Sequence, residues 1–182
     1  MEFPERIKNL QQYRFSDKEG LKLSKTIKFL KGNQMKVHEK SLIEDNVILR
    51  ADLAQIIVEK CCIICENVII HPSLNGMNAP FEYRPMNIGQ FCFIGKNTII
   101  SSLKIGNYVY IGENCILSDR TKIGDNVKIL DNTFVPSDME LVEYGIYEGY
   151  PAKLVGYLEY QHSKYMEYLC GDYFEKLITL KK

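Results

Sequence analysis

The hydrophobic residues of this chain recur at every sixth position. Steps of six from Ile105 meet a branched aliphatic residue each time as far as Leu141, and shorter series start at Val37 and Val58. Glycine follows the aliphatic residue in the pairs Ile88-Gly89, Ile94-Gly95, Ile105-Gly106, Ile111-Gly112 and Ile123-Gly124. Neither a helix period of 3.6 nor a strand period of 2 predicts this spacing. The pattern therefore indicates a structural repeat of six residues.

We count the aliphatic residue as the first position of the six-residue unit. Two further positions of the unit then also accept only a few residue types. The fifth position holds only compact residues, namely Cys62, Val68, Cys92, Thr98, Val109, Cys115, Thr121, Val127 and Thr133. The fourth position is often asparagine, at Asn67, Asn97, Asn114, Asn126 and Asn132. Asparagine tolerates the left-handed backbone of a tight corner, and glycine fits where another backbone comes close. We therefore predict short strands joined by sharp corners, in coils that stack on one another.

The repeat covers residues 26–156 with one large interruption. Residues 71–86 contain three prolines and a glycine, which predict a loop that projects from the solenoid. Residues 1–25 fit no repeat and are expected to form an end cap or a partner-binding arm. In residues 157–182 the apolar residues follow helical spacing, at Tyr165, Met166, Leu169, Cys170, Tyr173, Phe174 and Leu177. We expect this amphipathic helix to lie along the flank of an all-β parallel β-helix.

Composition excludes several classes of function. The 23 basic residues balance the 23 acidic ones, whereas a nucleic-acid-binding module is usually basic. No apolar run approaches the length of a membrane span, so we expect no membrane insertion. The first residues show no secretory signal, which favours a cytoplasmic location.

The cysteines are expected to fill the core. Cys62, Cys92 and Cys115 take the compact inward position, where a free thiol packs as a small hydrophobe. Cys65 falls at the second position, on the outside of the coil, so Cys62 and Cys65 should not converge on one metal ion. The sequence thus predicts no zinc site in this isolated C-x-x-C pair.

The repeat resembles the hexapeptide-repeat proteins, whose pattern of an aliphatic residue, glycine and a later small residue it matches. Periodicity alone does not set the hand of the coil, but this resemblance implies a left-handed β-helix. Some of these proteins are γ-class carbonic anhydrases, which bind zinc through three histidines. This chain has only His38, His71 and His162, and His71 alone lies near a family ligand position. We therefore expect no metal site.

Other hexapeptide-repeat proteins are acyltransferases that use acetyl-coenzyme A, and this remains the alternative enzymatic hypothesis. Residues 149–155, Gly-Tyr-Pro-Ala-Lys-Leu-Val, resemble the segment of those enzymes that runs beside coenzyme A. The enzymes also need a histidine base on a loop, and here only His71 stands at a loop root. We expect the segment to be a structural exit from the β-helix, with no catalytic residue and no cofactor. A γ-carbonic-anhydrase-like protein is the second alternative.

Several stretches together resemble the dynactin subunit 5 family of pointed-end dynactin subunits. They are residues 19–24, 47–54, 128–136 and 172–177. The resemblance implies a non-catalytic adaptor subunit, cytoplasmic and associated with the cytoskeleton, that supports cargo engagement (endosomes, for example) in dynein-driven transport. It also implies partners: dynactin subunit 6, a pointed-end actin-related protein, other dynactin subunits, and dynein or cargo adaptors. The projecting loop carries interface-type residues, so we expect partner binding at Phe81, Tyr83 and Arg84.

Overall fold

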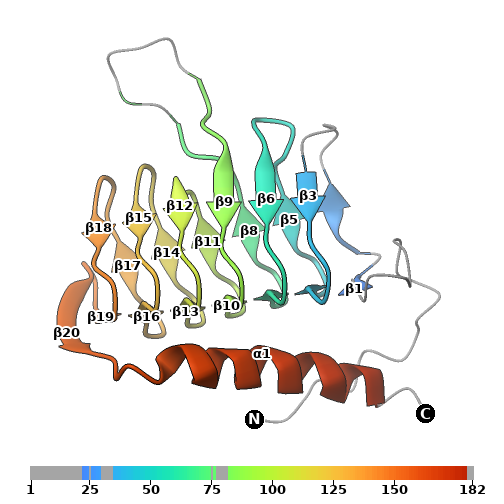
Figure 1. Cartoon of the computed structure of the whole chain (residues 1–182). Helices are drawn as coiled ribbons and strands as arrows, with labels where there is room; N and C mark the ends of the chain where they lie inside the picture. Colours follow the sequence, from blue (N-terminus) through green and yellow to red (C-terminus); the bar gives the residue numbers. More distant parts are fainter. Residues whose placement is uncertain (1–21, 25, 30–34, 75, 77–81, 180–182) are drawn as a thin grey trace.

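The computed structural model describes residues 22–24, 26–29, 35–74, 76 and 82–179. Three parallel sheets wind around one core, and helix α1 (His162–Thr179) runs along one of them (Figure 1). The predicted all-β parallel β-helix with a C-terminal α-helix is confirmed. Among the described residues, no helix is both long enough and apolar enough to cross a bilayer.

Each sheet collects every third strand of the chain. Sheet A contains β1 Lys22–Leu23, β4 Leu42–Ile43, β7 Ile63–Ile64, β10 Phe93–Ile94, β13 Tyr110–Ile111, β16 Lys128–Ile129, β19 Gly145–Glu148 and β20 Lys153–Tyr157. Sheet B contains β2 Lys28–Phe29, β5 Ile48–Leu49, β8 Ile69–Ile70, β11 Ile99–Ile100, β14 Ile116–Leu117 and β17 Phe134–Val135. Sheet C contains β3 Met35–Val37, β6 Ile56–Val58, β9 Met86–Ile88, β12 Lys104–Ile105, β15 Lys122–Ile123 and β18 Glu140–Leu141.

The core consists of the first and fifth positions of the repeat. In sheet A the register aligns Ile64, Ile94 and Ile111, and all three side chains are fully buried. The compact residues of the fifth position are buried beside them, as at Cys92 and Val109. Each stacked aliphatic side chain contributes about 1.5–3 kcal/mol when it leaves water. The six-residue period therefore identified the interior correctly.

The corners use asparagine and glycine as predicted. Asn67, Asn97 and Asn114 adopt φ values of 60°, 58° and 56°, and their side-chain amides form a ladder of hydrogen bonds from coil to coil. Glycine stands where successive coils approach each other: a Cβ on Gly106 would lie 2.6 Å from the carbonyl oxygen of Gly124. Since the atom that this Cβ would meet belongs to the backbone and cannot easily move, only a residue without a side chain fits there.

Strands β1 and β20 form the two ends of the solenoid that the structure describes. Strand β1 lies inside the segment 1–25 and pairs with β4, so pairing among the described residues begins at Lys22; residues 1–21 lie outside the described residues. At the other end, β19 and β20 form an antiparallel hairpin that closes sheet A. The backbone of Phe134 bonds to Gly149 and Ala152, which holds the hairpin against β17.

Helix α1 covers the outer face of sheet A, as expected for an amphipathic helix on the flank. Met166, Cys170, Tyr173 and Phe174 are buried against Leu42, Ile63, Cys65 and Phe93. Tyr165 was predicted on the same face, and this is wrong: its side chain is 54% exposed and its ring lies beside His162. The helix is rotated so that Met166 faces the sheet. The side chain of Leu177 lies outside the described residues.

Candidate functional site

The projecting loop presents two of the three predicted partner-binding residues. Tyr83 is 40% exposed and forms an antiparallel bridge with Leu74 across the loop. Arg84 is exposed, and its backbone N–H donates to the carbonyl oxygen of Ser73 at 2.8 Å. Phe81 lies outside the described residues. Tyr83 and Arg84 are thus adjacent and accessible at the base of the loop.

Hydrogen bonds fix the root of this loop to a later coil. The hydroxyl of Ser73 accepts from the backbone N–H of Arg120 at 2.7 Å. The carboxylate of Asp119 accepts from the backbone N–H of Leu74 at 3.2 Å. Ser73 is fully buried, so these bonds form away from water and hold the chain entering the loop in one place.

A cavity of about 430 Å³ opens beneath the loop base. Its lining residues are Leu74, Arg84, Pro85, Leu103 and Arg120. The guanidinium of Arg120 already binds the Asp138 carboxylate through two hydrogen bonds of 2.6 and 2.7 Å. The arrangement offers apolar walls and the exposed Arg84 cation, which suits a protein segment that carries an acidic residue.

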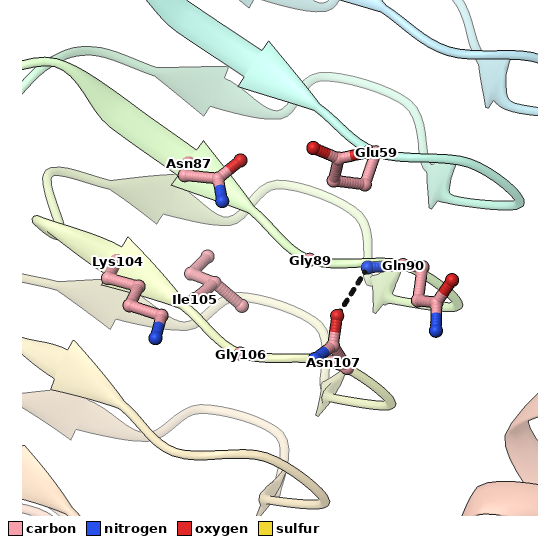
Figure 2. Close-up of a pocket in the computed structure, with 8 residues that line it drawn as sticks. All are labelled: Glu59, Asn87, Gly89, Gln90, Lys104, Ile105, Gly106 and Asn107. Carbon is pink, nitrogen blue, oxygen red and sulfur yellow. Dashed lines mark hydrogen bonds between the residues drawn. The ribbon is translucent and has the colours of Figure 1, made fainter.

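Figure 2 shows a second, polar hollow of about 270 Å³ at the corner between sheets C and A. It is lined by Glu59, Asn87, Gly89, Gln90, Lys104, Ile105, Gly106 and Asn107. The backbone N–H of Gln90 donates to the Asn107 side chain at 3.1 Å, so part of the polar lining is satisfied within the wall. None of the lining residues is a histidine, cysteine or serine that could act as a base or nucleophile in acyl transfer.

The three histidines are separate and each has its own contact. His38 approaches Glu59 at 3.9 Å on the surface. His71 accepts a hydrogen bond from the Ser101 hydroxyl through Nε2 at 2.7 Å, since its Nδ1 donates to the Pro72 carbonyl. His162 donates to the carbonyl oxygen of Tyr108, and burial lowers its pKa.

The cysteines occupy structural positions. Cys62, Cys92 and Cys115 are buried in the core, and their thiols donate to backbone carbonyl oxygens of the next coil. Cys65 points outward from its coil as predicted, yet it is only 2% exposed because helix α1 covers it. Burial raises the pKa of the Cys65 thiol well above its ordinary value. Within the ranges that the structure describes, no three His, Cys, Asp or Glu side chains gather as metal ligands.

Arg50 and Asp52 pair within a single corner. The guanidinium donates to both carboxylate oxygens at 2.9 and 3.0 Å. The bond is local, since the two residues are two positions apart in the sequence. Such an exposed pair contributes little to stability.

A buried carboxylate fastens helix α1 to the solenoid, and the sequence analysis missed it. Glu44 is 3% exposed; it accepts from the Tyr173 hydroxyl at 2.7 Å and from the backbone N–H of Glu66 at 3.1 Å. Burial raises the pKa of Glu44, and the bond from Tyr173 partly opposes this shift. The repeat could have drawn attention to this residue, because Glu44 stands at the second position, where glycine is common.

Comparison with known proteins gives two results. The profile of the family "Dynactin subunit 5" matches residues 1–182. The chain is 37% identical over 86 residues to dynactin subunit 5 of Dictyostelium discoideum, an alignment that covers 47% of this chain and 43% of that protein. The chain thus matches less than half the length of this relative.

Solved structures of similar fold are bacterial transferases. An N-acyltransferase mutant of Bacillus cereus bound to dTDP and coenzyme A superposes with a TM-score of 0.67 and 14% identity, over 88% of this chain and 99% of that one. A hexapeptide transferase family protein of Anaplasma phagocytophilum gives 0.63 and 17%, over 87% and 92%. At identities this low, the structural likeness shows that the chain shares the hexapeptide-repeat left-handed β-helix, but it gives no information about activity. Because the family profile extends over both the repeat and the segments outside it, the chain belongs to the dynactin subunit 5 family.

Proposed function

We propose that this chain is a non-catalytic structural and adaptor subunit of the dynactin pointed-end complex. The family match over residues 1–182 carries the proposal, since it includes the terminal segments that a hexapeptide fold alone does not require. In this role the chain packs beside dynactin subunit 6, close to a pointed-end actin-related protein, in the cytoplasm and on the cytoskeleton. It supports cargo engagement, for example of endosomes, through other dynactin subunits, dynein and cargo adaptors.

The chemistry of the described surface supports a non-catalytic role. The hollow in Figure 2 offers amides, one carboxylate and one ammonium group without a histidine base. His71 and His162 are engaged with Ser101 and with a backbone carbonyl. The segment 149–155, which resembles a coenzyme A contact, takes part in the hairpin that closes sheet A.

The loop base is the proposed partner-binding site. Tyr83 and Arg84 are exposed there, and the bonds of Ser73 to Arg120 hold the loop root in place. A rigidly held aromatic residue beside an exposed arginine is the combination that dominates the binding energy of many protein interfaces. We extend the site to Phe81 from its place in the sequence.

The proposal is tested in cells that lack the chain and are rescued with variants. Arg84→Glu combined with Tyr83→Ala is expected to lower the frequency of endosome runs, while the sedimentation of dynactin reports whether the complex still assembles. Lys164→Glu combined with Tyr168→Ala, on the exposed face of α1, is the matched control and should rescue fully. Normal endosome transport in cells without the chain would contradict the adaptor role.

A further inference from the structure

The three walls of the solenoid differ in what faces outward. Sheet A presents an apolar row that helix α1 covers. Sheet C presents a mainly polar row, including Asn87, Lys104 and Lys122, as expected for a wall in water. Sheet B presents a row that is apolar in five successive strands, hereafter the sheet B row: Ile48, Ile69, Ile99, Ile116 and Phe134.

No helix covers the sheet B row among the described residues. Ile99 and Ile116 are 37% and 39% exposed, and Phe134 is partly exposed, with the ring of Tyr150 tilted against it at a centroid distance of 4.7 Å. Tyr150 is itself 76% exposed. A continuous apolar strip of this kind on a flat wall is typical of an interaction surface, because apolar residues exposed on monomeric proteins are mostly scattered singly.

A row of charges follows one edge of this strip. The residue three positions before each member of the row is charged in all five coils: Asp45, Glu66, Lys96, Glu113 and Asp131. Lys96 is paired with Glu66 at 3.3 Å, so the edge has a negative excess. We call Asp45, Glu113 and Asp131 the acidic corner. On the opposite edge, Arg50 and Arg120 are already bound to Asp52 and Asp138.

Helix α1 shows which kind of element fits such a row. On sheet A its residues Met166, Cys170 and Tyr173, at i, i+4 and i+7, pack on outward residues of successive coils. Strands lie about 4.8 Å apart, so five members of a row span about 19 Å. A helix covers that length with about 13 residues, and its pitch of about 5.4 Å nearly matches the spacing of the coils.

We propose that the outer face of sheet B is a docking site for an amphipathic α-helix of a partner chain. Apolar residues at i, i+4, i+7 and i+11 pack on the sheet B row, and lysines or arginines on one flank lie along the acidic corner. A second copy docked through the same wall does not fit these requirements, because among the described residues that wall carries the acidic corner, and Arg50 and Arg120 beside it are already paired. The inference goes beyond the proposed function, since it assigns a wall and the chemistry of its occupant.

Site-specific photo-crosslinking in the full chain, expressed in its own cells, tests the proposal. Benzoylphenylalanine is placed at position 116 in the sheet B row, and at position 57 on the outer face of sheet C as the matched control. Mass spectrometry of the crosslinked peptides should identify, for position 116, a segment of another protein with the stated apolar spacing and a basic flank. Thermal unfolding of both variants shows that they fold.

Charge reversal provides the second readout. Glu113→Lys should lower the crosslinking yield at position 116 by at least about fivefold, because it places like charges together. Glu143→Lys, at the corner between sheets C and A, should leave the yield unchanged. The proposal is overturned if position 116 crosslinks to a second copy of this chain, to residues 1–21 of the same chain or to a non-helical segment. Equal yields at positions 57 and 116 also overturn it.

The failure of this inference is distinguishable from failure of the proposed function. Dynactin subunits that co-purify with the chain, without a crosslink at position 116, leave the proposed function standing and remove the docking site. A crosslink from position 116 to a helical segment, without any co-purifying dynactin subunit, supports the docking site and contradicts the proposed function.

Discussion

Replacing Tyr173 with phenylalanine removes one hydroxyl group from the contact between helix α1 and sheet A. The ring keeps its edge-on packing against Phe93, at a centroid distance of 5.7 Å. The Glu44 carboxylate loses its 2.7 Å hydrogen bond while it stays buried. Leaving a buried charged group without this partner costs about 1.5–3 kcal/mol. For a chain of this size the melting temperature should fall by roughly 3–12 °C.

The size of this effect should depend on pH. Burial raises the pKa of Glu44 above its ordinary value of 4.5, so the folded chain holds that proton more tightly than the unfolded chain. The free energy of unfolding therefore falls as the pH rises above 4.5 through the folded-state pKa. The Tyr173 hydroxyl favours the carboxylate and opposes this loss. Tyr173→Phe should consequently be more damaging at a pH of about 8 than at about 5.

Thermal unfolding by circular dichroism at both pH values, with hydrogen exchange of the α1 peptides, measures the effect. Tyr168→Phe removes the same hydroxyl from a helix residue that is 69% exposed, and serves as the control. Faster exchange in α1 should accompany the lower melting temperature of Tyr173→Phe. Equal melting temperatures for the two variants, or a loss that does not change with pH, would refute the role of Glu44.

Two pairs of substitutions and one chemical reaction test the corners, helix α1 and the core. Gly106→Ala should lower the free energy of unfolding by about 1–3 kcal/mol in a urea titration, because the new Cβ meets the Gly124 backbone. Gly171→Ala should raise it by about 1 kcal/mol, because its Cβ enters open space on α1 and alanine favours a helix over glycine. Asn97→Ala should cost about 1–2 kcal/mol because alanine disfavours a φ of 58°, and Asn97→Gly should cost less. An alkylating reagent should modify the partly exposed Cys61 in the folded chain, as read by mass spectrometry. It should modify the buried thiols only after the chain unfolds, namely Cys62, Cys65, Cys92, Cys115 and Cys170.

The interior of the solenoid could be predicted from the sequence because the six-residue period leaves one consistent set of inward positions. Ile94, Ile111 and Cys92 follow directly from that count, and all are fully buried. The outer faces obey no such rule. Cys65 and Glu44 are outward from their coils, and their burial depends on where helix α1 lies. Helical spacing predicted that a helix exists. That Tyr165 faces away from sheet A could be learned only from the packing of helix α1 on that sheet.

The candidate site was predicted only in part. The prolines around residues 71–86 indicated the projecting loop, and Tyr83 and Arg84 are exposed there. The bonds of Asp119 and Ser73 that hold the loop root join residues more than 40 positions apart, since the pairs differ by 45 and 47 in sequence. No local pattern carries such information. The sheet B row was visible as a second apolar residue in five of these strands, and only the strand register shows that its members align.

Gentle purification of the tagged chain from its own cells, with mass spectrometry of the chains that co-purify, tests whether it is a dynactin subunit. Dynactin subunits are expected in a constant ratio to the chain, with a second hexapeptide-repeat protein among them. Recovery of the chain alone, as a homotrimer, would contradict its assignment as a dynactin subunit.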